Sequence, residues 1–215
     1  ERERASIELL LKNPIEKIRE ISFEAEAAVT KPLLLKIAGL ELPAINKPRN
    51  RELKVHGGID PGDYWRREWL AGMIDMALAL DIVPPTVVRN GPFGRGSVQL
   101  FVDADFTQHY FTLRAEPGHR PTLERLCVFD VLANNADRKG GHCLLAKDGQ
   151  IFAIDNGLTF HAQWKLRTVI WDFGGEPIPR PLLDDLRRFK TAGLPGALGE
   201  LLHPAERAAL RDRAD

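Results

Sequence analysis

Cysteine is scarce in this chain of 215 residues, and its scarcity excludes several kinds of protein. The two cysteines, Cys127 and Cys143, have neither the spacing of a thiolate metal site nor that of a redox pair. A small secreted domain held together by disulfides is therefore excluded, because such domains need several paired cysteines. The low cysteine content is typical of a reducing compartment, and we expect a cytoplasmic location.

Long apolar runs and an excess of one charge are missing as well. No segment approaches the roughly 20 apolar residues that cross a bilayer, and no signal peptide is visible in the sequence, which begins at Glu1. Thirty basic residues balance thirty acidic ones, so no net field draws the chain to nucleic acid or to anionic lipid. We therefore expect no transmembrane segment and no nucleic-acid partner.

The remaining composition is that of a globular protein. Hydrophobic residues make up 44% of the chain and charged residues 28%, which is ordinary for a folded domain. A chain of this length is large enough to bury a core and is expected to form one domain or one bilobal unit over residues 1–215. No internal repeat or low-complexity tract is present.

In the first half, apolar periodicity predicts two helices and four strands. The helices are expected at Ala5–Ile21, where Pro14 should break or restart the helix, and at Asp63–Leu80. The strands are expected at Ala27–Ile37, Leu40–Asn46, Val83–Val88 and Ser97–Val102, with a turn at Gly39 and a loop over Arg49–Gly62. The glycines of Gly91–Gly96 favour a hairpin turn over a phosphate cradle, since they fall between two of these strands.

The second half is predicted to be mainly helical. A helix over Leu123–Asn134 has Thr122 as its N-cap, and a hairpin over Cys143–Ile154 turns at Asp148-Gly149. Two helices follow, at Arg180–Thr191 and Pro195–Arg213. We therefore expect an α+β fold with two parts: residues 1–102 as an N-terminal helical appendage plus a β-rich lobe, and residues 103–215 as a helical lobe.

The segment from Phe129 to His161 spaces two acidic residues as phosphoryl-transfer sites do. Asp137 lies in a polar loop after the apolar helix, and Asp155 follows a short apolar strand. Phosphoryl transfer needs a carboxylate to receive the proton of the acceptor, and carboxylates or amides to hold Mg²⁺ against the phosphates. This segment can supply both.

Two short motifs carry a family resemblance. Asn135-Ala136-Asp137-Arg138 and Ile154-Asp155-Asn156-Gly157-Leu158 resemble the catalytic and metal-binding loops of the protein-kinase-like superfamily. The segments Ala44–Pro48 and Leu80–Thr86 agree in their order along the chain. The pattern is most similar to type II phosphatidylinositol 4-kinases and small bacterial phosphatidylinositol 3-/4-kinase-related proteins, over residues 34–175. The resemblance implies an atypical bilobal kinase-like fold with nucleotide between the lobes.

The resemblance also implies roles for individual residues in binding ATP. Lys47 would bridge the α- and β-phosphates, and Glu68 on the following helix would hold it in place. Thr30, Lys31 and Gln99 are further candidates for nucleotide contact. The alternative is that Lys47 is a solvated strand end and Glu68 an exposed helical charge, as is common for these residue types.

In the catalytic loop, Asp137 is the expected base and Arg138 a second catalytic residue. Arg138 has an alternative role, in which it pairs with a neighbouring carboxylate instead of touching phosphate. Asp130 lies two helical turns before Asp137 and is expected to brace the loop by hydrogen bonds. Asp137 itself has the alternative of capping backbone amides in an Asn-rich turn.

The expected metal ligand is Asp155, with Gly157 allowing a sharp backbone turn. Five residues after Asp137, where kinases place a second ligand Asn, the chain has His142. Imidazole suits Mn²⁺ or Zn²⁺ better than Mg²⁺. Either Asp155 carries Mg²⁺ or Mn²⁺ mainly alone, or His142 binds phosphate, or activity is weak. A zinc site made of His142, Asp155 and His161 is a further alternative.

A second departure concerns the loop that covers the phosphates in kinases. The equivalent region, Glu26–Pro32, contains no glycine. Downstream, His161–Asp172 occupies the place of a substrate-binding segment, and its Lys165 and Arg167 can face an anionic acceptor or a membrane surface. The leading expectation is an ATP-dependent phosphotransferase whose acceptor is a protein, a small molecule or a lipid headgroup. The alternatives are a pseudokinase that binds nucleotide or acts as a scaffold, and an enzyme of adenylyl transfer or acyl activation.

Overall fold

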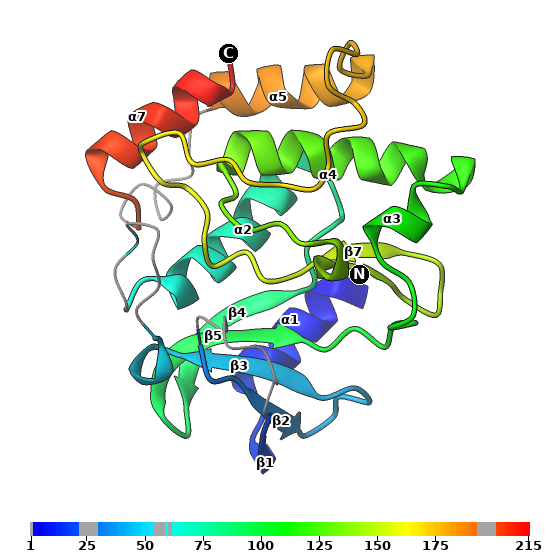
Figure 1. The fold of residues 1–215 in the computed structure, drawn as a ribbon. Helices are drawn as coiled ribbons and strands as arrows, with labels where there is room; N and C mark the ends of the chain where they lie inside the picture. The colour runs from blue at the N-terminus through cyan, green and yellow to red at the C-terminus, as the bar shows by residue number, and fades with distance from the viewer. Residues whose placement is uncertain (1, 22–29, 54–58, 60–61, 193–200) are drawn as a thin grey trace.

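A small antiparallel sheet and a larger helical part make up the molecule (Figure 1). The computed structural model describes residues 2–21, 30–53, 59, 62–192 and 201–215. The expected α+β class is confirmed, with the sheet formed by the first half of the chain and most helices by the second half. None of the helices in these ranges is long and apolar enough to span a membrane.

Five strands form the larger sheet in the order β1-β2-β3-β5-β4, with every neighbouring pair antiparallel. Their bounds are Ile15–Glu20 for β1, Leu33–Ile37 for β2, Ala44–Pro48 for β3, Thr86–Gly91 for β4 and Gly94–Leu100 for β5. Side chains alternate between the two faces along β3, so Ala44 and Asn46 lie on one face and Lys47 lies on the other. The tight β4–β5 connection agrees with the hairpin turn expected from the glycines.

The first face of this sheet is covered by α1, which spans Arg2–Lys12. Leu10 is fully buried there, in one cluster with apolar residues of β2, β3, β4 and β5. The carbonyls of Leu10 and Asn13 accept hydrogen bonds from Arg89 on β4, at 2.7 and 3.0 Å, so the end of the helix is tied to the sheet. Helix α1 is therefore part of the β-rich lobe.

The expected continuation of this helix to Ile21 is wrong. After Pro14 the chain forms β1, which pairs with β2 from Ile15 to Glu20. Proline has no N–H to donate and disfavours helical geometry in the residue before it, so the helix ends. The apolar residues Ile15 and Ile18 have helical spacing. Backbone hydrogen bonds to the edge of β2 nevertheless stabilise a strand here instead of a helix.

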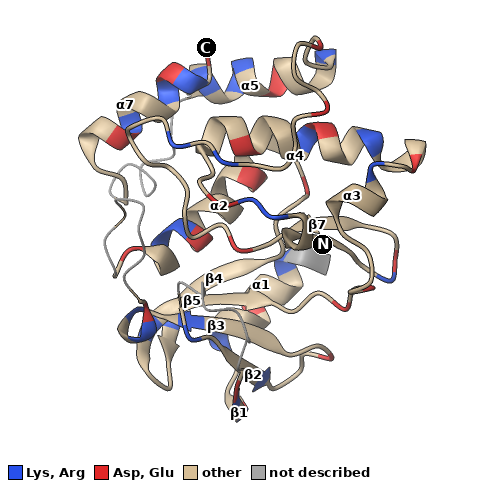
Figure 2. Cartoon of the chain, in the orientation of Figure 1, with Lys and Arg blue, Asp and Glu red and all other residues tan. Residues whose placement is uncertain are grey.

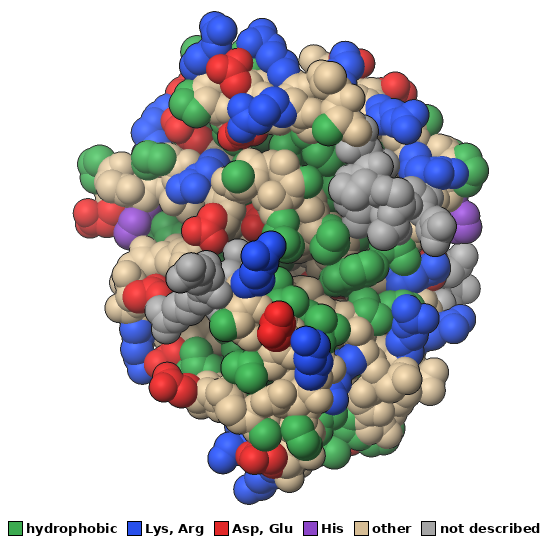
Figure 3. Space-filling view, turned by 180° about the vertical axis from the view of Figure 1, so that it is seen from behind, with side chains coloured by type: hydrophobic (Ala, Val, Ile, Leu, Met, Phe, Trp, Pro, Cys, Tyr) green, Lys and Arg blue, Asp and Glu red, His purple; other side chains and the backbone are tan. Residues whose placement is uncertain are grey.

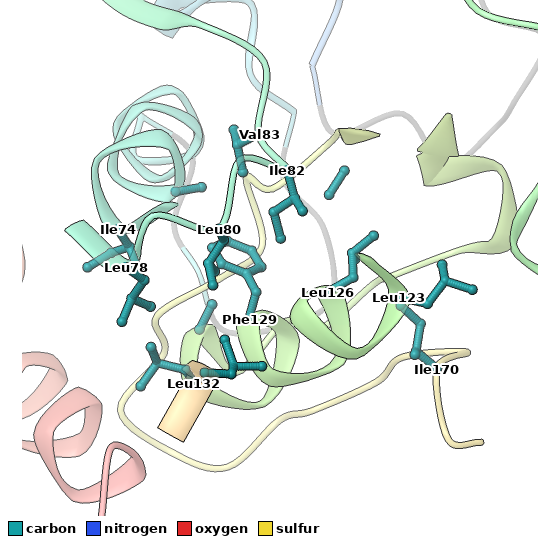
Figure 4. Packing of buried hydrophobic residues seen from close by; sticks show 14 of the residues in the cluster. Ile74, Leu78, Leu80, Ile82, Val83, Leu123, Leu126, Phe129, Leu132 and Ile170 are labelled. Carbon is teal, nitrogen blue, oxygen red and sulfur yellow. The ribbon is translucent and has the colours of Figure 1, made fainter. Parts of the chain in front are cut away.

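Helix α2, Tyr64–Leu78, lies between the sheet and the helices of the second half, close to its expected bounds (Figure 1). Ile74 and Leu78 on α2 are buried in the same core as Leu126 and Phe129 of α4 (Figure 4). Leu70 belongs to this core as well. The helix therefore packs its apolar side into the core of the helical part, and its start lies beside the sheet.

The helical part is built around α4, Arg120–Ala133, which begins earlier than expected. Its N-cap is His119, so Thr122, the expected N-cap, lies inside the first turn. Pro121 also lies in this turn, where the backbone N–H groups have no intrahelical partner and proline loses no hydrogen bond. The expected hairpin is confirmed as β6, Cys143–Leu145, and β7, Ile151–Ala153. The remaining helices are α3 at Tyr110–Leu113, α5 at Arg180–Ala192 and α7 at Pro204–Arg213, with short 3-10 turns at Arg49–Arg51, Pro117–His119 and Gly140–His142.

Three expected segments differ from the structure or extend beyond the described residues. The strand predicted from Ala27 begins at Leu33, and residues 22–29, which include part of the glycine-free loop, lie outside the described residues. The same holds for residues 54–58 and 60–61 of the predicted loop. The last helix begins at Pro204, and residues 193–200 of its predicted range are likewise outside.

Candidate nucleotide and metal site

Lys47 lies at the centre of the candidate site. Its ammonium contacts Asp155 Oδ1 at 2.8 Å across 108 positions of sequence, and it also donates a hydrogen bond to Glu68 Oε1. Strand β3 supplies Lys47, the second turn of α2 supplies Glu68, and the loop after β7 supplies Asp155. The pairing of Lys47 with Glu68 that the sequence predicts is present, and Glu68 is buried, not solvated. Figure 2 shows acidic and basic positions on α2 and on the loops between the sheet and the helices.

Glu68 also fixes the loop that carries Asp155. Its second oxygen accepts a hydrogen bond from the backbone N–H of Asn156 at 3.0 Å. A Cβ placed on Gly157 would lie 3.3 Å from Tyr64 Cβ and 3.4 Å from Glu68 Oε1, so glycine permits the close approach of this loop to α2. The expected reason for Gly157, a sharp turn, is wrong, since the residue with positive φ is Asp155, at 58°. Asp is one of the few residue types that adopt this conformation with little strain.

The charges of the three side chains depend on one another. Burial alone would lower the pKa of Lys47, but the carboxylates of Asp155 and Glu68 outweigh burial and hold that pKa above its usual range. Burial would raise the pKa of Asp155, yet the Lys47 ammonium holds it well below its usual range. Burial raises the pKa of Glu68 against the opposing charge of Lys47. At neutral pH a protonated Lys47 therefore lies beside an ionised Asp155.

His142 lies on the other side of Asp155, with Nε2 at 3.5 Å from Oδ2. Burial lowers the pKa of His142 to about 4, so the ring is neutral at pH 7. Its Nδ1 faces the backbone N–H of Lys139 at 3.4 Å, and an N–H can only donate, which assigns the ring proton to Nε2. This tautomer directs an N–H toward Asp155, and a metal could bind Nε2 only in the other tautomer.

The zinc alternative is not supported by the arrangement of its ligands. His142, Asp155 and His161 are all described, and no group of three or more His, Cys, Asp or Glu side chains that could hold a metal ion occurs among the described residues. Asp155 and His142 remain as a pair.

Asp137 has both carboxylate oxygens in ion pairs. Oδ1 lies 2.8 Å from Arg167 Nη2, and Oδ2 lies 2.9 Å from Lys139 Nζ. Its backbone N–H donates to Asn135 Oδ1, so the Asn side chain, rather than Asp137, caps this turn. The side chain is 17% exposed.

Arg138 and Asp130 form a buried network beneath the site. Arg138 donates to Asp130 through Nε and Nη2, to the carbonyl of Ile154 at 2.7 Å and to Asn156 Oδ1 at 2.6 Å. Asp130 also accepts from Asn135 and from Thr168, and thus braces the loop that carries Asp137. Both side chains are 0% exposed, so Arg138 cannot touch phosphate. The expectation that Arg138 is catalytic is wrong, and its alternative, pairing with a neighbouring carboxylate, is what the structure shows.

The three further nucleotide candidates have other surroundings. Gln99 is buried and donates to Thr86 Oγ1 at 2.8 Å. Thr30 is buried in an isolated bridge with Glu52, and the Lys31 side chain is exposed. Within the described part of the chain the hydrogen bonds and ion pairs of the Lys47 side chain go to Glu68 and Asp155, and none goes to these three residues.

Sequence reasoning missed two residues that support the site. Asn156 belongs to the Ile154–Leu158 motif, and its side chain and backbone join Arg138 to Glu68. Arg67 precedes Glu68 and is buried, although its sequence surroundings assign it no role. The signal that could have found Arg67 is its position on the inward side of α2, one turn before the buried Ala71.

Comparisons with known proteins show what the chain is similar to. No protein-family model matches the chain. Over 185 residues it is 37% identical to Protein Rv2133c of Mycobacterium tuberculosis, a match that covers 69% of this chain and 66% of that protein. Over 178 residues it is 29% identical to Phosphatidylinositol 4-kinase gamma 4 of Oryza sativa subsp. japonica, covering 72% of this chain and 30% of that protein. Both matches span less than two thirds of the relative's own length.

Among solved structures, the chain is similar to the Helicobacter pylori proinflammatory kinase CtkA. The TM-score is 0.52 at 14% sequence identity, with 96% of this chain and 92% of that chain covered. At this low identity the likeness concerns the fold alone. The chain therefore has a kinase-like α+β fold.

Proposed function

We propose that this protein is an ATP-dependent phosphotransferase of the atypical kinase type. The observation that carries the proposal is the position of Lys47, whose ammonium contacts both Glu68 and Asp155 although the three residues come from separate elements. Kinases use a strand lysine, a helical glutamate and a metal-binding aspartate in this relation to hold the phosphates of ATP. The distant kinase relative and the kinase-like fold support the same reading.

In this proposal ATP lies between residues 1–102 and 103–215. Lys47 binds the α- and β-phosphates, and Glu68 keeps its side chain extended into the site. Thr30, Lys31 and Gln99 belong to the β-rich lobe and remain proposed as further contacts for the nucleotide. Nucleotide binding then depends chiefly on Lys47.

The residues present fit a divalent cation. The Asp155 side chain is 34% exposed, and Mg²⁺ is usually held by one or two carboxylates together with substrate phosphates and water. When bound, Mg²⁺ or Mn²⁺ would neutralise charge on the phosphates. His142 donates toward Asp155 and orients its carboxylate in this proposal.

Asp137 is the proposed base for the acceptor hydroxyl, which is carried by a protein, a small molecule or a lipid headgroup. For the proton to reach it, the ion pair with Arg167 or with Lys139 has to open. Exposed ion pairs are worth only up to about 1 kcal/mol, so opening one is a small cost.

Thermal unfolding with nucleotide tests the proposal. At about one hundred times its dissociation constant, a ligand that binds only the folded state stabilises it by roughly 2.7 kcal/mol. We expect ATP to raise the melting temperature more with Mg²⁺ or Mn²⁺ than without, and Asp155→Asn to remove the metal-dependent part. ADP formation should then be detectable by chromatography. No stabilisation by any adenine or guanine nucleotide at millimolar concentration would refute the proposal.

A pseudokinase is the second candidate, and the two ion pairs that occupy Asp137 favour it. It predicts the same thermal stabilisation by ATP but no ADP with any acceptor. Formation of AMP instead of ADP would point to adenylyl transfer in the same site.

A further inference from the structure

Arg67 precedes Glu68 on α2, and its guanidinium is buried against two distant segments. Nη2 lies 2.6 Å from Glu206 Oε1, across 139 positions of sequence, and Nη1 donates to the carbonyl of Thr159. The two side chains of the ion pair are 8% and 9% exposed. Glu206 lies in the first turn of α7 and also accepts a hydrogen bond from the backbone N–H of His203, so it is fixed to the start of that helix.

Consecutive residues on a helix move as one body, because the backbone hydrogen bonds hold their relative positions. Arg67 therefore ties Glu68 to α7 and to the segment that follows Asp155. Glu68 in turn contacts Lys47 and the N–H of Asn156. Through these contacts the second turn of α2 is held from the side of the helical part, in addition to the contact with Lys47 of the sheet.

Stabilisation alone does not account for such a pair. Removing two charges from water costs several kcal/mol, and a buried ion pair often contributes no net stability compared with apolar residues. Its better-attested effect is to select one arrangement among several. Here that arrangement is the one in which Glu68 reaches Lys47.

We propose that Arg67 and Glu206 are positioning residues, and that α7 uses them to set the place of Glu68 at the phosphate-binding lysine. The effect on nucleotide affinity rests on the proposed function, whereas the effect on the place of Glu68 does not. The adjacent Arg66 offers a matched control, since its ion pair with Asp63 is local and more exposed.

The test combines two measurements on the full chain. In the protein without nucleotide, the amide resonance of Asn156 in a ¹H–¹⁵N NMR spectrum reports its hydrogen bond to Glu68. Arg67→Met and Glu206→Gln should shift this resonance, and Arg66→Met should leave it in place. With ATP and Mg²⁺, the same two variants should raise the dissociation constant about fivefold or more, which is the lower range of coupling between sites.

A double-mutant cycle separates positioning from general stability. If Arg67 acts through Glu68, Glu206→Gln should add no further loss of affinity in a Glu68→Gln background. Arg67→Met leaves Glu206 buried without its partner and can unfold the protein, so Arg67→Met combined with Glu206→Met, which removes both charges, serves as the second variant.

A lower melting temperature with an unmoved Asn156 resonance and unchanged ATP affinity would overturn the proposal. The proposal would also be overturned if Glu206→Gln reduced ATP affinity as much in the Glu68→Gln background as in the wild type. If the wild-type protein binds no nucleotide, the proposed function fails, while the Asn156 resonance still decides whether α7 positions Glu68.

Discussion

Arg167 Nη2 donates a 2.8 Å hydrogen bond to Asp137 Oδ1, which pairs the proposed base with a cation from the segment that follows Asp155 in the chain. The backbone keeps the two residues together: Arg167 N–H donates to the carbonyl of Asn135 at 2.8 Å, and Arg138 N–H donates to the carbonyl of Arg167 at 3.0 Å. The Arg167 side chain is nevertheless 77% exposed, so it can leave Asp137 without disturbing this backbone pairing.

Asp137→Asn should separate catalysis from nucleotide binding. A general base acts on the transition state, so turnover should fall by about 10²–10⁴-fold while ATP affinity stays nearly unchanged. Steady-state rates beside calorimetric ATP titrations give both values. Equal turnover in the variant and the wild type would remove Asp137 from the mechanism.

Arg167→Gln should raise turnover modestly. Opening an exposed ion pair costs up to about 1 kcal/mol, so its removal should increase the rate by no more than about fivefold. Arg180→Gln, which breaks the exposed pair with Asp184, is the matched control and should have no effect. A large loss of activity in Arg167→Gln would show instead that this side chain contacts the substrate.

Gly157→Ala should destabilise the loop that carries Asp155. The added Cβ would meet Tyr64 and Glu68 at 3.3 and 3.4 Å, and overpacking of this kind costs about 1–3 kcal/mol. Gly118, where an added Cβ meets nothing within 4 Å, gives the control variant, expected to change stability by less than about 0.5 kcal/mol. Urea unfolding of both variants measures the difference, and equal midpoints would contradict the packing argument.

Stability should fall with acid because of His142. Its pKa is lowered from an ordinary 6.5 to about 4 in the folded protein, so between these values the unfolded chain binds a proton that the folded chain does not. The contribution is fully present above pH 6.5 and is lost as the pH falls to 4, by up to about 3 kcal/mol. The free energy of unfolding of His142→Asn, measured across this range, should lack this part of the decline. Parallel curves for variant and wild type would disprove the assignment.

The same substitution should change the preference for metal. An Asn side chain offers an oxygen, which suits Mg²⁺, whereas imidazole suits Mn²⁺ better. We expect His142→Asn to raise Mg²⁺-supported activity and to leave Mn²⁺-supported activity similar or lower. Unchanged activity with both ions would place His142 outside the metal's surroundings.

The parts of the site that the sequence predicts are those encoded by local order. Lys47 at a strand end, Glu68 on the next helix and Asp155 after a hairpin follow from periodicity and from the family resemblance. Asp130 could be expected to brace the loop because it lies near the end of the helix that precedes Asp137. These residues lie on, or directly after, helices and strands that the apolar periodicity of the sequence indicates clearly.

The remaining features depend on contacts between distant segments. Nothing local distinguishes buried Arg67 from exposed Arg66, because the difference is a partner 139 positions away. The strand at Ile15 escaped prediction for the same reason, since β1 exists through its pairing with β2. The surface adds little signal: Figure 3 shows positive and negative side chains interspersed over one face, in keeping with the balanced charge.

The packing of α2 has a consequence for motion. Its apolar residues share a core with α4, whereas the sheet and α1 share another, so Lys47 and Glu68 lie on elements of two different cores. If the two cores shift relative to one another when nucleotide enters, Lys47 should move with the sheet and Glu68 with α2. The contact between Lys47 and Glu68 joins these two elements. Its making and breaking would then report the position of the sheet relative to α2.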